Sequence, residues 1–312
     1  MDFRLTTPDL ASERVGNTGT AGVWHFDSGA PGRTLMLSAL LHGNELCGAW
    51  ALKDLLASGF RPRRGGLVLA FCNLDAFDRF DRSHHDASRF VDEDMNRVWS
   101  ADRLDRPLTA DSRRAAALRP WVERAEWLLD LHSMHEPSAP LLLTGVLPRN
   151  IALARELKAP AHVIVDAGHK DGVRMRDFAQ FGDATRDDAC ALLIECGFHG
   201  DLASRTVACD MVARMLLASG IADPEDIPSG WLSPDPPAQR VLRVTDAIVA
   251  PSMDFRFARP WQCLDTLADR GTVLGWADGE AITTPYDQCT LIMPSLRQLK
   301  PGVTVMRLAR DL

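Results

Sequence analysis

Two apolar runs of this sequence end on side chains that could bind one metal ion. The sequence His-Gly-Asn-Glu at positions 42–45 follows the run 34–41, and His132 follows the run 127–131. Imidazole and carboxylate groups are common Zn²⁺ ligands, and two histidines with one carboxylate leave the fourth coordination position for water or substrate. Ligand sites of parallel α/β sheets form beyond the carboxyl ends of strands, so we predict that His42, Glu45 and His132 bind one Zn²⁺ per chain. The motif alone leaves open that His42 caps a strand and Glu45 opens a helix.

Two further residues support this prediction. Gly43 permits a sharp turn between the two expected ligands. Asp130 lies two residues before His132, so both side chains share one face of the expected strand, and Asp130 could hold the histidine in place. The alternative for Asp130 is a hydrogen-bonded buried carboxylate without a catalytic part.

A third apolar run, residues 191–195, ends on Glu195. A buried glutamate is costly unless it is paired or functional. Beside a metal, its carboxylate could take a proton from water and pass it to a leaving nitrogen. The alternative is an ion pair with an arginine. The charged segment 89–97 carries two arginines, of which one could match a carboxylate and the other could polarise a scissile carbonyl, although in isolation it could be a solvated loop.

Other residues offer competing ligands or nucleophiles. His135 lies three residues after His132, His199 lies four after Glu195, and positions 84 and 85 are both histidine. None of these has two partners already placed at separate strand ends, so they rank second. Cys196 could act as a nucleophile beside a histidine, but a small buried thiol is the simpler interpretation.

Apolar runs alternate with helical patterns over about residues 34–220. Strands are expected at 34–41, 67–73, 127–131, 141–144, 162–165 and 191–195, and helices at 45–57, 111–124, 149–157 and 202–219. Unbroken apolar runs are typical of strands covered on both faces, and the alternation predicts an α/β fold with an open, mostly parallel sheet. A proline-rich linker is expected at 223–240, between an α/β domain at 1–222 and a small β-rich domain at 241–312.

Composition limits the classes of function. The chain has 312 residues, 46% of them apolar, and a net charge of -7, which argues against a dedicated nucleic-acid binder. No signal peptide or membrane-spanning run is evident, and the seven cysteines form no C-x-x-C pair, so a cytoplasmic protein with reduced thiols and no membrane partner is expected. A homo-oligomer is left open.

Together the motifs resemble the succinylglutamate desuccinylase and aspartoacylase family. The resemblance is carried by His42-Gly-Asn-Glu45, Arg89 with Asp94-Met-Asn96-Arg97, Asp130-Leu-His132 and Glu195-Cys-Gly197, in that order. It implies a zinc carboxypeptidase-like fold, with a mostly parallel or mixed central sheet flanked by helices and a barrel-like C-terminal β module. It also implies a zinc-dependent deacylase that uses a Zn²⁺-bound water to cleave an N-acyl amino acid.

The resemblance assigns roles to single residues. His42, Glu45 and His132 would bind Zn²⁺, Glu195 would be the general base and then the proton donor, and Arg89 would polarise the amide carbonyl. Asn96 and Arg97 would bind the α-carboxylate of the substrate, and Asn73 matches a family position near the substrate. Two rival functions remain open: a metallo-carboxypeptidase acting on short peptides, and a non-catalytic protein that binds a metal or small molecule.

The sequence departs from the family in its polar contacts. Family members with acidic substrates use additional tyrosine and arginine contacts, whereas Tyr286 is the one tyrosine here and falls in the β module. Arg174, Arg176 and Asp177 form a polar cluster before the Glu195 strand and could set specificity, or could be a surface loop.

Overall fold

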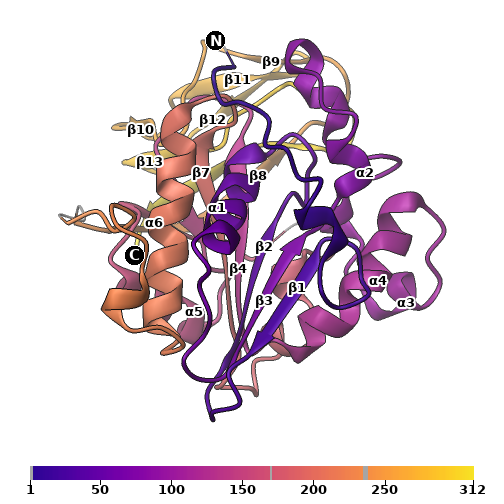
Figure 1. Ribbon diagram of the computed structural model, residues 1–312. Coiled ribbons are helices and arrows are strands. Elements are labelled where there is room, and N and C mark those ends of the chain that lie inside the picture. The colour runs from indigo at the N-terminus through magenta and orange to yellow at the C-terminus, as the bar shows by residue number, and fades with distance from the viewer. Residues whose placement is uncertain (1–2, 169–170, 235–237) are drawn as a thin grey trace.

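The apolar runs form the centre of a large mixed sheet in the computed structural model, which describes residues 3–168, 171–234 and 238–312 (Figure 1). Within these residues the sheet has eleven strands in the order β1-β3-β2-β4-β7-β5-β6-β8-β14-β13-β10. The strands of its first part are β1 (Val23–Asp27), β2 (Thr34–Ala39), β3 (Gly66–Phe71), β4 (Trp127–Met134), β5 (Leu141–Leu143), β6 (His162–Val165) and β7 (Cys190–Phe198).

The central strands confirm the α/β prediction. β3, β2, β4 and β7 run parallel, and all six predicted strands of this region are present. The sheet is mixed because β5 lies antiparallel to β7 and β1 lies antiparallel to β3. β1 was not predicted, because its sequence, VWHFD, alternates with polar residues and is only half-buried at the sheet edge.

Helices cover both faces of this sheet. They are α1 (Leu46–Ala57), α2 (Leu74–Phe77), α3 (Ala101–Asp105), α4 (Ala110–Arg124), α5 (Pro148–Leu157) and α6 (Leu202–Ala218). Alternate residues of β2 separate two cores: Leu35 and Leu37 pack in the core of α1 and α6, whereas Met36 packs in the core of α4. Figure 1 shows α1 and α6 together in front of the sheet.

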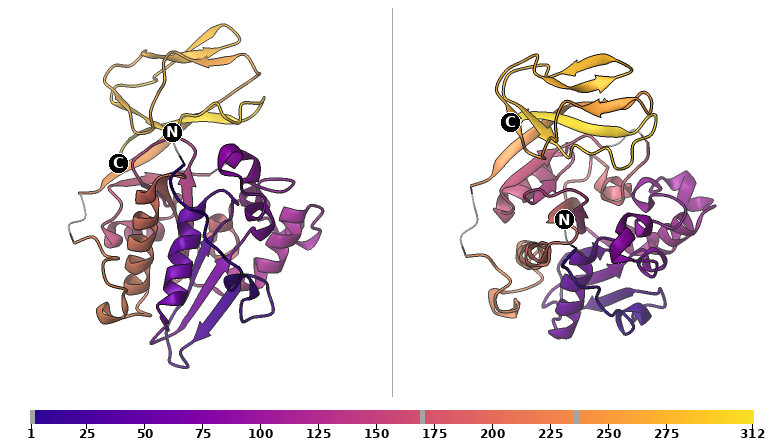
Figure 2. Two further views of the ribbon diagram at one scale, coloured as in Figure 1. Left: turned by 45° about the horizontal axis from the view of Figure 1, so that its top comes forward. Right: turned by 90° about the horizontal axis from the view of Figure 1, so that it is seen from above.

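The C-terminal strands extend the same sheet and add a second one. They are β8 (Arg240–Val249), β9 (Phe255–Phe257), β10 (Thr266–Leu267), β11 (Val273–Ala277), β12 (Glu280–Thr283), β13 (Cys289–Ile292) and β14 (Thr304–Asp311). β8 pairs with β6 in parallel and with β14 antiparallel, while β12, β11 and β9 form a small separate antiparallel sheet. Figure 2 shows these strands gathered at one end of the molecule.

The predicted domain boundary remains a prediction. The chain from residue 240 onward does form β-strands, beginning with the ten-residue β8, but the β6–β8 pairing carries one continuous sheet across this position. Residues 235–237 of the predicted linker, with two of its prolines, lie outside the described residues. In the part of the chain that the structure describes, no helix combines the length and apolar character needed to cross a bilayer.

Candidate active site

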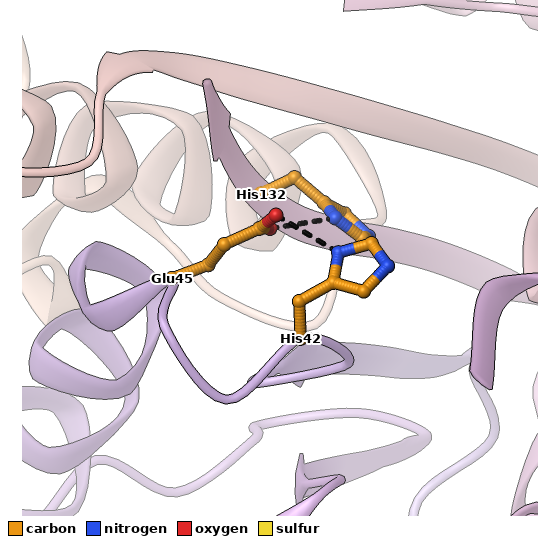
Figure 3. A group of neighbouring side chains, drawn as sticks. All are labelled: His42, Glu45 and His132. Atoms are coloured by element: carbon orange, nitrogen blue, oxygen red, sulfur yellow. Dashed lines mark hydrogen bonds and ion pairs between the residues drawn. The ribbon is translucent and has the colours of Figure 1, made fainter. Parts of the chain in front are cut away.

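The three predicted metal ligands lie together at the carboxyl ends of β2 and β4 (Figure 3). His42 follows β2, Glu45 immediately precedes α1, and His132 lies in β4. The Nδ1 atoms of His42 and His132 are each 2.8 Å from one of the two Glu45 carboxylate oxygens. All three side chains are buried, so their close approach is fixed by the packing of the strands around them.

Gly43 permits this arrangement for a different reason from the predicted turn. Its backbone φ is outside the left-handed region, but a Cβ at this position would lie only 2.4 Å from the carbonyl carbon of Ala76 and 2.5 Å from the carbonyl oxygen of Ser88. The loop between His42 and Glu45 therefore needs glycine because it is pressed against neighbouring backbone.

The donor set fits a divalent metal ion. One ligand atom from each of His42, Glu45 and His132 can be chosen so that all three lie within 4.8 Å of one another. Nitrogen and carboxylate ligands bind zinc at about 2.0–2.2 Å, which requires ligand atoms roughly 3–3.5 Å apart in a tetrahedral site. The observed separations can reach these values by small side-chain movements.

Each histidine of the triad also contacts a carboxylate through its other nitrogen. His42 Nε2 is 2.8 Å from Asp94 Oδ1, and His132 Nε2 is 2.7 Å from Asp130 Oδ2. The Ser38 hydroxyl donates to the other oxygen of Asp130 at 2.7 Å. Such outer carboxylates fix the orientation of metal-binding histidines and raise their basicity. The sequence indicated this orienting role for Asp130 but not for Asp94.

Electrostatics favour charged forms within the triad. Burial alone would raise the pKa of Glu45, but His42 and His132 hold it well below the usual value. Burial alone would lower the pKa of His132, but Asp130 and Glu45 outweigh burial and hold it well above the usual value. A cation could take the place of this proton, because metal binding and protonation compete for the same ligands.

Glu195 lies beside the triad on β7, in register with His132 on β4. Its carboxyl group is buried, and its Oε2 atom has no hydrogen-bond partner. Burial, followed by repulsion from Glu45, raises the pKa of Glu195 well above its usual value. A buried carboxyl group without a partner is costly for stability, so this arrangement indicates a functional role. The predicted alternative, a direct arginine ion pair, is not formed at Oε2, although the charge of Arg89 acts on Glu195 from nearby.

Arg89 lies next to the triad as predicted for a carbonyl-polarising group. Its Nη1 atom is 3.3 Å from Glu45 Oε1, and its Nη2 atom is 3.2 Å from Asp94 Oδ2. Burial alone would lower the pKa of Arg89, but Asp94 and Glu45 raise it, so the guanidinium remains cationic. Asp94 thus holds both His42 and Arg89.

The residues predicted to bind substrate divide into two groups. Asn96 and Arg97 line the cavity that contains the triad and Glu195. Asn96 Oδ1 accepts a bond from the backbone N–H of Met175 at 3.1 Å. Asn73 instead donates to Asp111 Oδ1 at 2.6 Å and caps α2, and it is outside the cavity lining, so its substrate role stays a prediction.

The cavity has a volume of about 160 Å³ and two chemically distinct walls. One wall is basic: Arg174 and Arg307 contact Asp166 there, and Arg97 contacts Asp171. The other is apolar and surrounds Glu195, with contributions from Met134, Leu143, Leu193, Ile292 and Met293. The strands around β13 and β14 therefore supply part of the cavity, which the sequence did not reveal.

Arg174, Arg176 and Tyr286 have different surroundings. Arg174 is buried against the cavity, and its Nη2 atom has no hydrogen-bond partner. Arg176 is buried outside the cavity lining, and burial, followed by repulsion from Arg174, lowers its pKa to about 10. The Tyr286 hydroxyl bonds to Thr245 Oγ1 at 2.5 Å, away from the cavity lining.

The competing candidates do not join the triad. Cys196 is buried, and burial with a bond to Cys47 raises the pKa of its thiol well above the usual value, which disfavours a nucleophilic thiolate. His84 is exposed. His135 and His199 form a separate pair, with His199 Nε2 at 3.3 Å from His135 Nδ1.

The buried histidine His199 predicts a pH dependence of stability. Its Nδ1 atom bonds Ser133 Oγ at 2.7 Å, and burial lowers its pKa well below the usual value despite opposition from Glu45, with His135, Arg89 and His85 lowering it further. Below about pH 6.5 this histidine is therefore protonated in the unfolded chain but stays neutral in the folded chain. The free energy of unfolding decreases as the pH falls.

We expect the His199→Asn substitution to reduce this dependence. As the pH falls below about 6.5, the unfolding free energy of wild type should decrease more steeply than that of the variant. The gap should grow by up to about 1.4 kcal/mol per pH unit. Urea unfolding between pH 7.5 and 5.5 measures it, with exposed His84→Gln as the control for histidine number. Parallel pH profiles of wild type and His199→Asn would contradict the prediction.

Comparison with known proteins identifies the family of this chain. The model of the succinylglutamate desuccinylase/aspartoacylase catalytic domain matches residues 31–208. The chain belongs to the succinylglutamate desuccinylase/aspartoacylase family. This confirms the resemblance seen in the motifs, and the matched range contains the triad, Arg89 and Glu195. The family's names indicate deacylases, which are hydrolases.

Two curated family members show the extent of the sequence similarity. The chain is 31% identical over 121 residues to a succinylglutamate desuccinylase of Paraburkholderia xenovorans, covering 34% of this chain and 33% of that protein. It is 25% identical over 300 residues to a succinylglutamate desuccinylase of Burkholderia cenocepacia, covering 89% of this chain and 81% of that protein.

Solved structures of the family share the fold. The succinylglutamate desuccinylase of Vibrio parahaemolyticus has a TM-score of 0.68 and 16% identity, with 94% of this chain and 86% of that chain covered. The enzyme of Chromobacterium violaceum has a TM-score of 0.64 and 20% identity, covering 94% and 89%. The similarity extends over the C-terminal strands as well as the catalytic region.

Proposed function

We propose that this family member is a zinc-dependent deacylase that hydrolyses the amide bond of a small N-acyl amino acid. The observation that carries the proposal is the placement of Glu195. Glu195 lines the same cavity as the His42–Glu45–His132 triad, and its buried Oε2 atom has no hydrogen-bond partner. A protein that only bound a metal would gain nothing from a buried, unpaired acid at this place, which disfavours the non-catalytic alternative.

The protein groups divide the proposed reaction among them. His42, Glu45 and His132 would hold the zinc ion, which when bound supplies Lewis-acid activation of water and carbonyl. Glu195 accepts a proton from the attacking water and then donates it to the departing amine nitrogen. Arg89 places its guanidinium where negative charge develops on the carbonyl oxygen. Asp94 and Asp130 keep the two imidazoles oriented throughout.

The basic wall supports a substrate that carries a carboxylate. Arg174 and Arg307 there share the buried carboxylate of Asp166, and the Nη2 atom of Arg174 has no hydrogen-bond partner. Arg97 and Asn96 would bind the α-carboxylate of the amino acid, as the family resemblance implies. The matching of a planar guanidinium to a carboxylate gives such binding its specificity.

The cavity disfavours the peptidase alternative. Ile292, Met293 and Arg307, all from the C-terminal region, line it and leave a volume of about 160 Å³. A peptide substrate needs an open groove for its extended chain, whereas side chains of the C-terminal region line this cavity. We also propose that the C-terminal region, predicted as a domain at 241–312, serves to close the site in this way.

Metal analysis followed by a hydrolysis screen tests the proposed function. The purified protein, loaded with Zn²⁺, is assayed against N-acetyl and N-succinyl amino acids beside short peptides. We expect about one zinc ion per chain and turnover confined to N-acyl amino acids. Cleavage of peptides alone would favour the carboxypeptidase, and a zinc-loaded protein inert across the panel would favour a binding protein.

The Arg97→Ala substitution is expected to weaken substrates with a free α-carboxylate. Loss of one charge-assisted contact costs about 1.5–3 kcal/mol, which corresponds to a fall in kcat/KM of about 10- to 150-fold. The same variant is assayed on α-carboxamide analogues, and the exposed Arg186→Ala serves as control. An equal loss on both substrate types would remove Arg97 from carboxylate binding.

A further inference from the structure

A chain of polar contacts leads from the active site to the surface through His135. His135 lines the cavity, and its Nε2 atom is 3.4 Å from Nη1 of Arg89. On the opposite side of the ring, Nδ1 is 2.8 Å from Asp86 Oδ1. Asp86 and His135 fall outside all four family motifs, whereas Arg89 belongs to one of them.

The contacts permit only one neutral form of the imidazole. Arg89 Nη1 is a donor without a lone pair, so Nε2 must present its lone pair to it. Asp86 Oδ1 is an acceptor, so Nδ1 must carry the proton. The opposite tautomer would set two donors against each other at Arg89 and two acceptors against each other at Asp86.

The neighbouring histidine agrees with this assignment. His199 Nε2 lies 3.3 Å from the same His135 Nδ1 and can accept from it when His199 donates its own Nδ1–H to Ser133 Oγ. Burial, partly opposed by the bond to Asp86, lowers the pKa of His135, which keeps the ring neutral at pH 7.

We propose that His135 is a positioning residue: held as the Nδ1–H tautomer by Asp86, it accepts a hydrogen bond from Arg89 and fixes the guanidinium beside Glu45. The consequence for catalysis rests on the proposed function. The tautomer of His135 and its contact with Arg89 do not depend on the proposed function.

Arg89 needs such a partner because its other two acceptors are shared. Glu45 also contacts both triad histidines, and Asp94 also contacts His42. A cation in the triad would draw on the charge of Glu45. His135 is a neutral acceptor, and the contact of its Nε2 lone pair is with Arg89.

The C-terminal region anchors this chain of contacts. Arg297 donates to Asp86 Oδ2 at 3.1 Å and to Glu136 Oε1 at 2.5 Å. Asp86 is thereby held from the far side while its other oxygen faces His135. The segment that carries Arg297 continues into Gln298, which lines the cavity.

Three substitutions at position 135 separate positioning from a general structural role. The amide oxygen of a glutamine reaches the place of the imidazole Nε2, whereas an asparagine amide reaches only the place of Nδ1. We expect His135→Gln to keep kcat within about threefold of wild type. His135→Asn and His135→Leu should lower kcat by about 10-fold or more with KM nearly unchanged, because the contact to Arg89 acts on the transition state. The exposed His84→Leu is the control.

Wild-type kcat in His135→Leu would overturn the proposal, as would a glutamine variant as impaired as the leucine variant. A change confined to KM would also overturn it, because it would indicate ground-state binding.

A spectroscopic measurement tests the tautomer without any activity. Nitrogen NMR of the zinc-free protein with ¹⁵N-labelled histidine distinguishes a protonated from an unprotonated ring nitrogen, and the His135→Gln spectrum assigns the signals. At pH 7.5 we expect Nδ1 protonated and Nε2 unprotonated, with this preference weakened in Asp86→Asn, where Arg89 alone still favours it. An Nε2–H tautomer or a doubly protonated ring would overturn the proposal. Should wild type cleave none of the N-acyl amino acids, the proposed function fails while this measurement still decides the tautomer of His135.

Discussion

Replacing Glu195 with glutamine is expected to lower kcat by about 10²- to 10⁴-fold, the usual contribution of a positioned general acid–base group. Glutamine has nearly the same shape but cannot take or give the proton. Glu195 is not one of the three clustered metal ligands, so the zinc content should stay near one ion per chain. The stability of the variant should equal or exceed that of wild type, because a neutral amide replaces a buried acid without a partner at Oε2.

Steady-state kinetics with metal analysis on the same samples measures this effect. The exposed Glu156→Gln on α5 is the matched control and should behave as wild type. Because the pKa of Glu195 is raised, activity should fall as the pH is lowered and the carboxylate takes up its proton. The residual activity of Glu195→Gln should not show this acid-side fall. Wild-type turnover in Glu195→Gln would show that another group is the base.

The strand-end residues could be predicted from sequence because one physical rule places them. β2, β4 and β7 are mostly apolar, which identifies buried parallel strands. The polar residues His42, His132 and Glu195 lie at or just beyond the carboxyl ends of these runs. Neighbouring strands then bring side chains close that are far apart in the chain.

The supporting residues could not be predicted because no local pattern marks them. Asp86 and Asp94 lie in charge-dense loops where most carboxylates are solvated, and only the folded chain shows which ones face His135 and His42. Arg307 lies in a strand of the C-terminal region, whose approach to the cavity depends on the β6–β8 pairing. The antiparallel β5 likewise has the same apolar sequence as a parallel strand, LLL, so its direction was not encoded locally.

Replacing His132 with alanine is expected to abolish stoichiometric zinc binding and, with it, activity. The variant keeps only His42 and Glu45 of the cluster, and it leaves Glu45 and Asp130 without their shared partner. Asp130→Asn should be milder. It keeps all three ligands but weakens the outer contact of His132, and loss of such contacts lowers metal affinity about 10- to 100-fold.

Zinc-dependent stabilisation measures both effects without a substrate. A ligand that binds only the folded chain stabilises it by about 2.7 kcal/mol at a concentration 100 times its Kd. Wild type and the surface control His84→Ala should therefore show a clear rise in Tm on addition of zinc. The Asp130→Asn variant should need a zinc concentration 10 to 100 times higher for the same rise, by the same estimate, and His132→Ala should show none at any of these concentrations. A His132→Ala protein stabilised by zinc as strongly as wild type would place the metal elsewhere. The deacylase mechanism would then lose its centre, because the positions of Glu195 and Arg89 acquire their meaning only around an ion held between His42, Glu45 and His132.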